Sequence, residues 1–174
     1  DTIKILSDLN KAYPFPNTDA AKAEHEALGE QSLDIIERAT KFMAEGSAEA
    51  LGKLMTEAEA LFDAKVDPMS SALWAPKLHA GLQDPTVQSL SWGGKGVGSH
   101  GDGSVQFLAR SEETQKQLAD YLNEQGMKAY TLTLKPVHTV RKAIIPVAGF
   151  GTRLYPATRG LKKDFFPIPC ADGM

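Results

Sequence analysis

The sequence predicts an α+β fold, in which helices pack on one face of an antiparallel sheet, followed by the first strand and glycine loop of an α/β domain. Three observations lead to this prediction. Helical periodicity dominates the first half of the chain, a strand–glycine loop–strand–helix–strand order follows, and a short apolar strand near the end runs into a second glycine turn. We expect one domain over residues 1–136, a linker over 137–141 and the truncated start of a second domain over 142–174.

The helices are predicted from apolar residues at helical spacing, from capping residues before them and from Pro or Gly after them. They are expected over residues 1–13, 20–44, 48–65, 70–82 and 112–125. Gly29 is expected to break or bend the second of these helices. His79, on the fourth, invites a catalytic interpretation, but a lone histidine on a helix is more often simply half-buried, and we interpret it so.

The strands are predicted from alternating or β-branched residues, and they are expected over 87–92, 104–109 and 128–135. Between the first two, the stretch 90–108 contains six glycines, one lysine and one aspartate. Glycine lets backbone N–H groups approach a ligand closely, and successive inward N–H groups form an anion site. The stretch therefore predicts a phosphate or sugar-phosphate site, whose expected residues are Gly93, Gly94, Lys95, Gly96, Gly98, Ser99, Gly101, Asp102 and Gly103.

The alternative for this stretch is a wide, flexible turn. A flexible linker is typically richer in serine and does not lie between apolar strands, so we favour the binding site.

The composition excludes several kinds of covalent link, metal site and membrane segment. The single cysteine, Cys170, excludes an internal disulfide and a cysteine-based metal cluster, and it fits a reducing, cytoplasmic location; no metal site is predicted. No apolar run approaches the ~20 residues that span a bilayer, so we expect no membrane contact. The chain begins without a methionine or signal peptide and stops within a recognisable pattern, so we expect a piece of a longer polypeptide.

Charge is distributed unevenly. Residues 1–127 contain 11 Lys and Arg against 20 Asp and Glu, whereas residues 128–174 contain 8 against 2. A basic end on an acidic body predicts an anionic partner for that end. Because no nucleic-acid motif or interleaved aromatic pattern accompanies the basic residues, we expect a small phosphorylated ligand rather than nucleic acid.

The basic end contains a second glycine turn. Residues 142–147 are typical of a short buried strand, and residues 148–153, Ala-Gly-Phe-Gly-Thr-Arg, form a turn such as opens nucleotide-binding α/β units. Leu154 stands where a dinucleotide fingerprint needs its third glycine, and no Gly-Lys-Ser/Thr of a P-loop is present. By spacing alone the pattern is weak.

As a whole, however, residues 142–168 resemble the opening of the sugar-1-phosphate nucleotidylyltransferases, most of all the glucose-1-phosphate uridylyltransferase type. The positions that match this family's pattern without a gap are Gly149, Gly151, Thr152, Arg153, Pro156, Thr158, Lys163 and Pro167. The resemblance implies that the backbone at Ala148, Gly149, Gly151 and Thr152 lies under the nucleotide.

It further implies that Arg153 and Lys163 are catalytic, because they stabilise charge on the triphosphate as pyrophosphate leaves, and that an NTP and Mg²⁺ are required. The parts of such an enzyme that read the base and hold the sugar and the metal would lie beyond Met174.

Residues 1–136 resemble the C-terminal half of the GHMP kinases, the superfamily of galactokinase, homoserine kinase, mevalonate kinase and phosphomevalonate kinase. The late glycine motif of this family, Gly-Ala-Lys-x-Thr-Gly-Ala-Gly-Gly-Gly-Gly-Cys, aligns with residues 93–104. It matches at Gly93, Lys95, Gly98, Gly101 and Gly103 and departs at Val97, His100, Asp102 and Ser104. The resemblance implies a ferredoxin-like domain that takes part in sugar phosphorylation with ATP and Mg²⁺, while the ATP loop and catalytic aspartate belong to the other half of the kinase.

Together the two resemblances imply a bifunctional sugar kinase and sugar-1-phosphate nucleotidylyltransferase, acting on a small sugar or sugar phosphate and a nucleotide. This piece alone is expected to be inactive. Two alternatives are a kinase with a vestigial tail and a non-catalytic ligand-sensing α+β domain that regulates the transferase. We also expect the unpaired edge of the strand over 142–147 to allow pairing with another copy of the chain.

Overall fold

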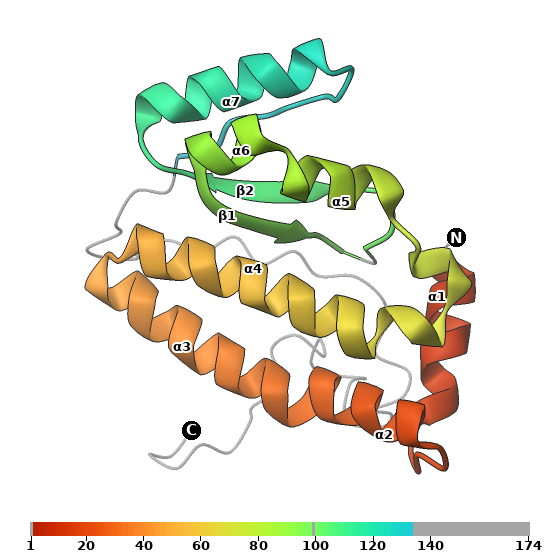
Figure 1. Cartoon of the computed structure of the whole chain (residues 1–174). Coiled ribbons are helices and arrows are strands. Elements are labelled where there is room, and N and C mark those ends of the chain that lie inside the picture. Colours follow the sequence, from red (N-terminus) through yellow and green to blue (C-terminus); the bar gives the residue numbers. More distant parts are fainter. Residues whose placement is uncertain (1, 99, 134–174) are drawn as a thin grey trace, which may run out of the picture. The chain divides into compact units, whose positions relative to one another are not determined.

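Helices and one two-stranded antiparallel sheet make up residues 2–98 and 100–133, which are the residues that the computed structural model describes (Figure 1). This combination confirms the α+β class. The finer expectation of a ferredoxin-like GHMP kinase domain stays a prediction, as do the two domains and the linker. All the described residues except Thr133 belong to one unit, Asp1–Leu132.

The first helices follow the predicted capping and spacing. Thr18 accepts a hydrogen bond from the Ala21 N–H at 3.1 Å and so begins the second helix, while Gly46 ends α3 with a φ of 68°. The expected bend at Gly29 takes the form of a π-helical turn between α2 and α3. The elements are α1 (Thr2–Leu9), α2 (Asp19–Glu26), the π turn (Ala27–Gln31) and α3 (Ser32–Glu45).

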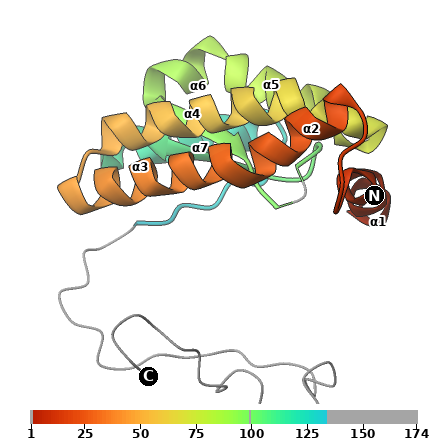
Figure 2. The same cartoon turned by 90° about the horizontal axis from the view of Figure 1, so that it is seen from below.

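The long helix α4 (Ala48–Lys65) packs between the N-terminal helices and the sheet. Both cartoon views show α3 lying alongside it (Figures 1 and 2). Arg38 of α3 reaches Glu57 of α4 with two hydrogen bonds of 2.6 Å, a bidentate geometry that fixes this pair of helices in place. Leu33, Ile36 and Met43 of α3 are exposed, so the apolar positions expected to face a core along this helix do so only in part.

The sheet is a hairpin of β1 (Ser91–Gly96) and β2 (Val105–Ala109), in which Gly94 pairs with Phe107, and an irregularity in register falls between Ser91 and Gly93. We call residues 91–109 the glycine hairpin. In Figure 1, α4 lies on one side of it and further helices lie on the other. These are α5 (Pro76–Gln83), α6 (Pro85–Leu90) and α7 (Glu112–Glu124). Helices therefore lie on both sides of the sheet, not on one as expected, because the glycines of β1 let α4 approach the second side.

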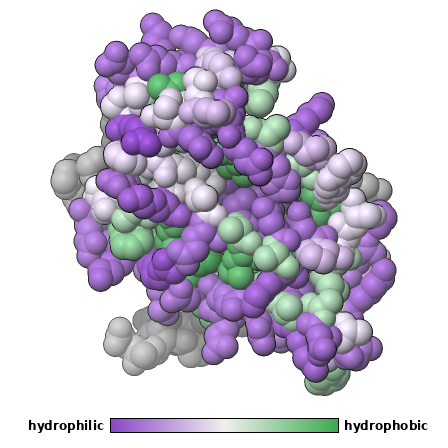
Figure 3. All heavy atoms as spheres, viewed as in Figure 1, coloured by the Kyte–Doolittle hydropathy of each residue, from purple (hydrophilic) through white to green (hydrophobic). Residues whose placement is uncertain are grey.

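Two apolar clusters hold these layers together. Ile5, Ala27, Val66 and Leu73 pack where the N-terminal helices meet the end of α4. Val87, Leu118 and Leu122 join α6 to α7, with Phe107 of the sheet packed against them. Hydrophilic residues predominate on the face seen in Figure 3, and its apolar residues gather in small separate patches.

The expected strand over 87–92 is wrong over residues 87–90 and correct at residues 91–92, which begin β1. Residues 85–90 form α6 instead, because Asp84 accepts hydrogen bonds from the N–H groups of Thr86 at 2.8 Å and Val87 at 3.0 Å. Pro85 occupies the first turn, where its missing N–H costs nothing. The strand begins only at Ser91, so β1 contains three of the glycines that were expected in a loop.

Two further boundaries differ from expectation. Ser70 caps only a 3₁₀ turn, Ser71–Leu73, through the Ala72 N–H, and α5 begins later, at Pro76. Residues 128–133 form no strand, because this segment runs beside α7: Asn123 binds the Ala129 N–H and Gln115 binds the Leu132 carbonyl. The rest of the expected strand, the linker, the strand over 142–147 and the turn over 148–153 lie outside the described residues. Of the described helices, none has the length and apolar character to cross a bilayer.

Candidate functional site

A cavity of about 470 Å³ lies against α4, α5 and the glycine hairpin. Thr56, Glu59 and Asp63 line it from α4, and His79 lines it from α5. The hairpin contributes Trp92, Gly93, Gly94 and Phe107 to the lining, and Arg110 adds to it just after β2. Carboxylates, an imidazole and backbone of a glycine-rich strand therefore meet in one place, which makes this cavity the candidate site.

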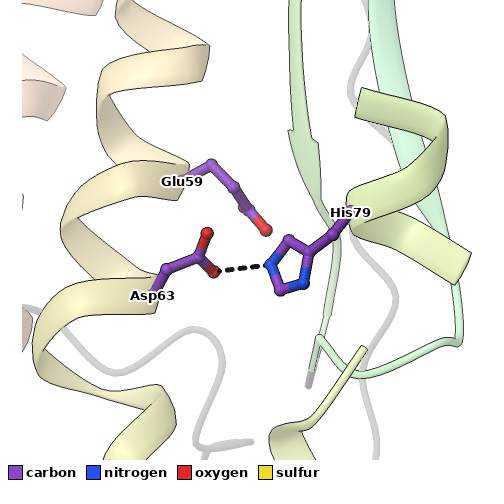
Figure 4. A group of neighbouring side chains, drawn as sticks. All are labelled: Glu59, Asp63 and His79. Atoms are coloured by element: carbon purple, nitrogen blue, oxygen red, sulfur yellow. Dashed lines mark ion pairs between the residues drawn. The ribbon is translucent and has the colours of Figure 1, made fainter. Parts of the chain in front are cut away.

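Glu59, Asp63 and His79, which we call the Glu–Asp–His cluster, point toward one another (Figure 4). Glu59 and Asp63 are four residues apart on α4, a spacing that places both side chains on the same helix face. His79 Nε2 lies 3.1 Å from Asp63 Oδ1. One donor atom from each residue lies within 4.8 Å of the others, close enough for a shared ion.

Glu59 is the buried member of the cluster, with 4% of its surface exposed. Its Oε2 accepts a hydrogen bond from the Gly96 N–H at 2.8 Å, and His100 Nδ1 lies 3.6 Å from the same oxygen. Burial alone would raise the pKa of Glu59, but the His100 imidazole and the Gly96 N–H together lower it below its usual range. Glu59 is therefore held as a carboxylate.

The pKa values of two neighbouring groups, His79 and Asp67, are raised instead. Asp63 accepts a hydrogen bond from His79 and so raises the pKa of that imidazole. Burial, followed by the negative charge of Asp63, raises the pKa of Asp67 to about 6. Negative charge is therefore concentrated near the end of α4, next to the cavity. His79 of α5 pairs with the Asp63 carboxylate there.

His100 fixes the turn of the glycine hairpin onto α4. Its ring stacks on Phe62, with ring centroids 3.7 Å apart and planes 6° apart, and its φ is 56°. This is the left-handed region that glycine favours, and the aligned kinase motif has glycine at this position. The stacking on Phe62 and the contact with Glu59 stabilise His100 in that backbone conformation.

The predicted glycine residues divide into two groups. Gly93, Gly94 and Gly96 lie in β1, where an added Cβ would collide respectively with the Gly52 carbonyl, the Phe107 ring and the His100 ring. Gly98 and Gly101 lie in the turn with φ values of 71° and 66°, and nothing lies within 4 Å of a Cβ at Gly98. Close packing explains the first group and backbone conformation the second, while Gly103 has only ordinary crowding at 3.4 Å.

The two charged residues of the predicted set have partners within the protein. Lys95 Nζ donates to the Gly96 carbonyl at 2.6 Å. Asp102 Oδ1 accepts from the N–H groups of Lys77 at 2.8 Å and Leu78 at 3.1 Å, so it caps α5 from the hairpin turn. Gly93 and Gly94 are the members of the predicted set that line the cavity. An anion-binding role for the set stays a prediction, and Ser99 lies outside the described residues.

Sequence reasoning missed several cavity residues. The spacing of Glu59 and Asp63 on a predicted helix was a usable signal, but nothing in the sequence shows that His79 faces them. Arg110 was missed as well: its guanidinium lies 4.3 Å from the centre of the Trp92 ring, and it donates to the carbonyls of Ser91 and Gln88. His79 is half-buried as expected, although it also carries the Asp63 contact.

The residues predicted for nucleotidyl transfer lie outside the described residues. These are Ala148, Gly149, Gly151, Thr152, Arg153 and Lys163. The structure therefore gives no geometry for them.

Comparison with known proteins finds similarity over a short stretch. A UTP–glucose-1-phosphate uridylyltransferase 2 of Streptococcus pyogenes serotype M3 is 66% identical over 29 residues, which are 17% of this chain and 10% of that protein. A putative UTP–glucose-1-phosphate uridylyltransferase of Methanocaldococcus jannaschii is 59% identical over 29 residues, with the same coverage. The chain thus spans about a tenth of the length of the curated relatives it matches. No protein-family model matches the chain.

Proposed function

We propose that this chain is part of a sugar-1-phosphate nucleotidylyltransferase. The observation that carries the proposal is the 29-residue similarity to two UTP–glucose-1-phosphate uridylyltransferases, at 66% and 59% identity. We assign that similarity to the stretch around Gly149–Lys163, where the sequence follows the pattern of this family. In the proposed reaction, a phosphate oxygen of the sugar-1-phosphate attacks the α-phosphorus of an NTP, and the bond to pyrophosphate breaks.

Arg153 and Lys163 have defined roles in this proposal. Negative charge grows on the β- and γ-phosphates as pyrophosphate leaves, and fixed positive charge at that point lowers the barrier. The backbone of Ala148, Gly149, Gly151 and Thr152 would lie against the nucleotide, since the glycines have no Cβ to keep it away. Mg²⁺ would accompany the NTP. The net positive charge of residues 128–174 supports an anionic ligand for this end.

A second proposed function is sugar phosphorylation by residues 1–136 together with a preceding ATP-binding half. The supporting observation is that the aligned glycine stretch is followed by a strand, β2, as the resemblance implies. Gly93 and Gly94 of that motif also line the cavity. Such a kinase would use ATP and Mg²⁺, and its sugar-1-phosphate product is the substrate that the transferase consumes. We further propose a cytoplasmic location and pairing with another copy of the chain through residues 142–147.

The experiment uses the full-length protein with two separate assays. Arg153→Ala and Lys163→Ala should each reduce pyrophosphate release from UTP and glucose-1-phosphate by at least 100-fold, because each removes a charge needed in the transition state. Lys162→Ala is the matched control, since this adjacent lysine lies outside the family pattern. Equal loss in all three variants, or no pyrophosphate release by the unaltered protein, would overturn the transferase proposal.

The kinase assay measures ADP formation with a panel of sugars. Gly98→Val should reduce this rate strongly, because a β-branched residue tolerates a positive φ poorly. It should leave pyrophosphate release nearly unchanged. Absence of any sugar-dependent ADP formation, together with transferase activity that responds to a sugar, would instead support the ligand-sensing alternative. The 174-residue chain alone should phosphorylate no sugar.

A further inference from the structure

The Glu–Asp–His cluster lies outside the segment that resembles the transferases, and the glycine motif does not include it. Its three side chains come from two helices, α4 and α5, and converge on one cavity (Figure 4). We propose that Glu59, Asp63 and His79 form a binding site for a divalent transition-metal ion, of which Zn²⁺ is the best match. This inference does not depend on the functions proposed above.

The donor set selects this class of ion. Imidazole suits zinc and its transition-metal neighbours, whereas Mg²⁺ and Ca²⁺ prefer oxygen ligands alone. Open zinc sites have three protein ligands, drawn from His, carboxylate and Cys, and water or another ligand takes the fourth position. Here that fourth position would face the cavity that Glu59, Asp63 and His79 line.

The distances fit after small side-chain rotations. The three donor atoms already lie within 4.8 Å of one another. Ligand atoms around a tetrahedral zinc ion, with bonds of about 2.0–2.2 Å, are separated by about 3.3–3.6 Å. His79 Nε2 and Asp63 Oδ1 are 3.1 Å apart, which is close to that separation. The backbone of α4 and α5 therefore places the side chains at the range that a bound ion requires.

Glu59 is anchored in a way that suits a metal ligand. One of its oxygens, Oε2, accepts the Gly96 N–H at 2.8 Å, which orients the carboxylate toward the cavity. The contacts with the Gly96 N–H and with His100 Nδ1 both fall on Oε2, so Oε1 is the oxygen that would meet an ion. Hydrogen bonds that orient the ligands from behind are a regular part of protein metal sites.

The surrounding charges favour a cation. Glu59 and Asp63 place two carboxylates side by side, and a divalent ion would relieve their repulsion. Three nearby cations have partners elsewhere. Lys53 pairs with Glu49 at 2.6 Å, Lys95 donates to the Gly96 carbonyl, and Arg110 binds the carbonyls of Ser91 and Gln88. Among the described residues, none of the three forms an ion pair with Glu59 or Asp63.

The test is metal titration of the purified 174-residue chain. Calorimetry with Zn²⁺ and visible absorption with Co²⁺ should each show one ion per chain, and millimolar Mg²⁺ should not displace it. His79→Ala and Asp63→Asn should each weaken binding at least tenfold. Glu59→Gln should do so while keeping an amide oxygen for the Gly96 N–H, and circular dichroism should show that all three variants are folded.

Three control variants test whether residues outside the cluster bind the ion. His25→Ala and Asp34→Asn change the same residue types outside the cluster and should leave binding unchanged. Cys170→Ser removes the one thiol of the chain and should also have no effect. The proposal is overturned by the absence of binding, by folded His79→Ala protein that binds as tightly as the parent, or by loss of the ion in the Cys170→Ser variant.

Discussion

Gly52 of α4 and Gly93 of β1 meet backbone to backbone. A Cβ on Gly93 would collide with the Gly52 carbonyl, and a Cβ on Gly52 would collide with the backbone and Cβ of Trp92. The wall of the cavity that joins α4 to the hairpin depends on this contact. We therefore expect Gly52→Ala to lower the free energy of unfolding by about 2–3 kcal/mol, as overpacking does, even though alanine favours a helix.

Urea denaturation of Gly52→Ala beside Gly29→Ala measures this effect. Gly29 also lies in helical structure, but nothing lies within 4 Å of its added Cβ, so its replacement should be neutral or stabilising. Equal stability of the two variants would show that α4 and β1 are not packed as described.

Asp102 should act as a helix cap. Its carboxylate accepts two N–H groups at the start of α5, so Asp102→Ala should cost about 1 kcal/mol of stability. Asp102→Asn keeps an acceptor oxygen and should recover most of that loss. Asp120→Ala, on the exposed surface of α7, is the control, and thermal denaturation is the measurement. A loss as large in Asp120→Ala would argue against the cap.

Glu24 should make the protein less stable as pH rises. It is fully buried and neither of its carboxylate oxygens has a hydrogen-bond partner among the described residues. Burial raises the pKa of Glu24, so the folded state holds the proton more tightly than the unfolded chain does. The stability that this proton provides is present below the unfolded pKa of about 4.5 and is lost as pH rises through the raised folded value.

Glu24→Met should therefore stabilise the protein at pH 7, by about 1–3 kcal/mol, the usual cost of an unsatisfied buried polar group. Its advantage over the parent should shrink toward pH 4. Glu30→Gln, at an exposed position, should show neither change. Denaturation curves at several pH values decide the matter, and an advantage that stays constant with pH would contradict the argument.

His79 should contribute to stability with the same sign of pH dependence, in a different range. Asp63 raises the pKa of His79, so its contribution is complete below the unfolded value of about 6.5 and is lost as pH rises through the raised folded value. An NMR titration in the presence of a chelator should show that Asp63→Asn lowers the pKa of His79. The His25 signal in the same spectra provides the reference. An unchanged His79 titration would mean that the two side chains do not interact in solution.

Most helices could be predicted because their determinants are local. Thr18 begins α2 and Ser111 begins α7 through side chains close in sequence to the N–H groups they cap. The strand predicted at 87–92 was wrong over residues 87–90 although Asp84-Pro85 was visible, because Val87 and Leu90 favour a strand as strongly as a buried helix face. A capping aspartate followed by proline was the better guide.

The candidate site could be predicted only in part, because its geometry depends on long-range contacts. A glycine needed for close packing and a glycine needed for a ligand look the same in a sequence, and Gly93 shows this. Asp102 lies 24 positions after Leu78, whose N–H it accepts, and the partner of Glu59 and Asp63 lies on another helix. The spacing within α4 could have indicated two of the three cluster residues, Glu59 and Asp63, but only the packing between helices adds His79.

The π turn at Ala27–Gln31 has a consequence for how this chain should be aligned with others. A π turn takes up one residue more than an α-helical turn within about the same rotation, so the helix beyond it keeps its facing side. Deletion of Gly29 should therefore close the wide turn and leave one uninterrupted helix from Asp19 to Glu45. The side that buries Glu24 and the side of α3 that meets α4 would keep their directions. A single-residue gap at this position is thus compatible with unchanged packing on both sides of it.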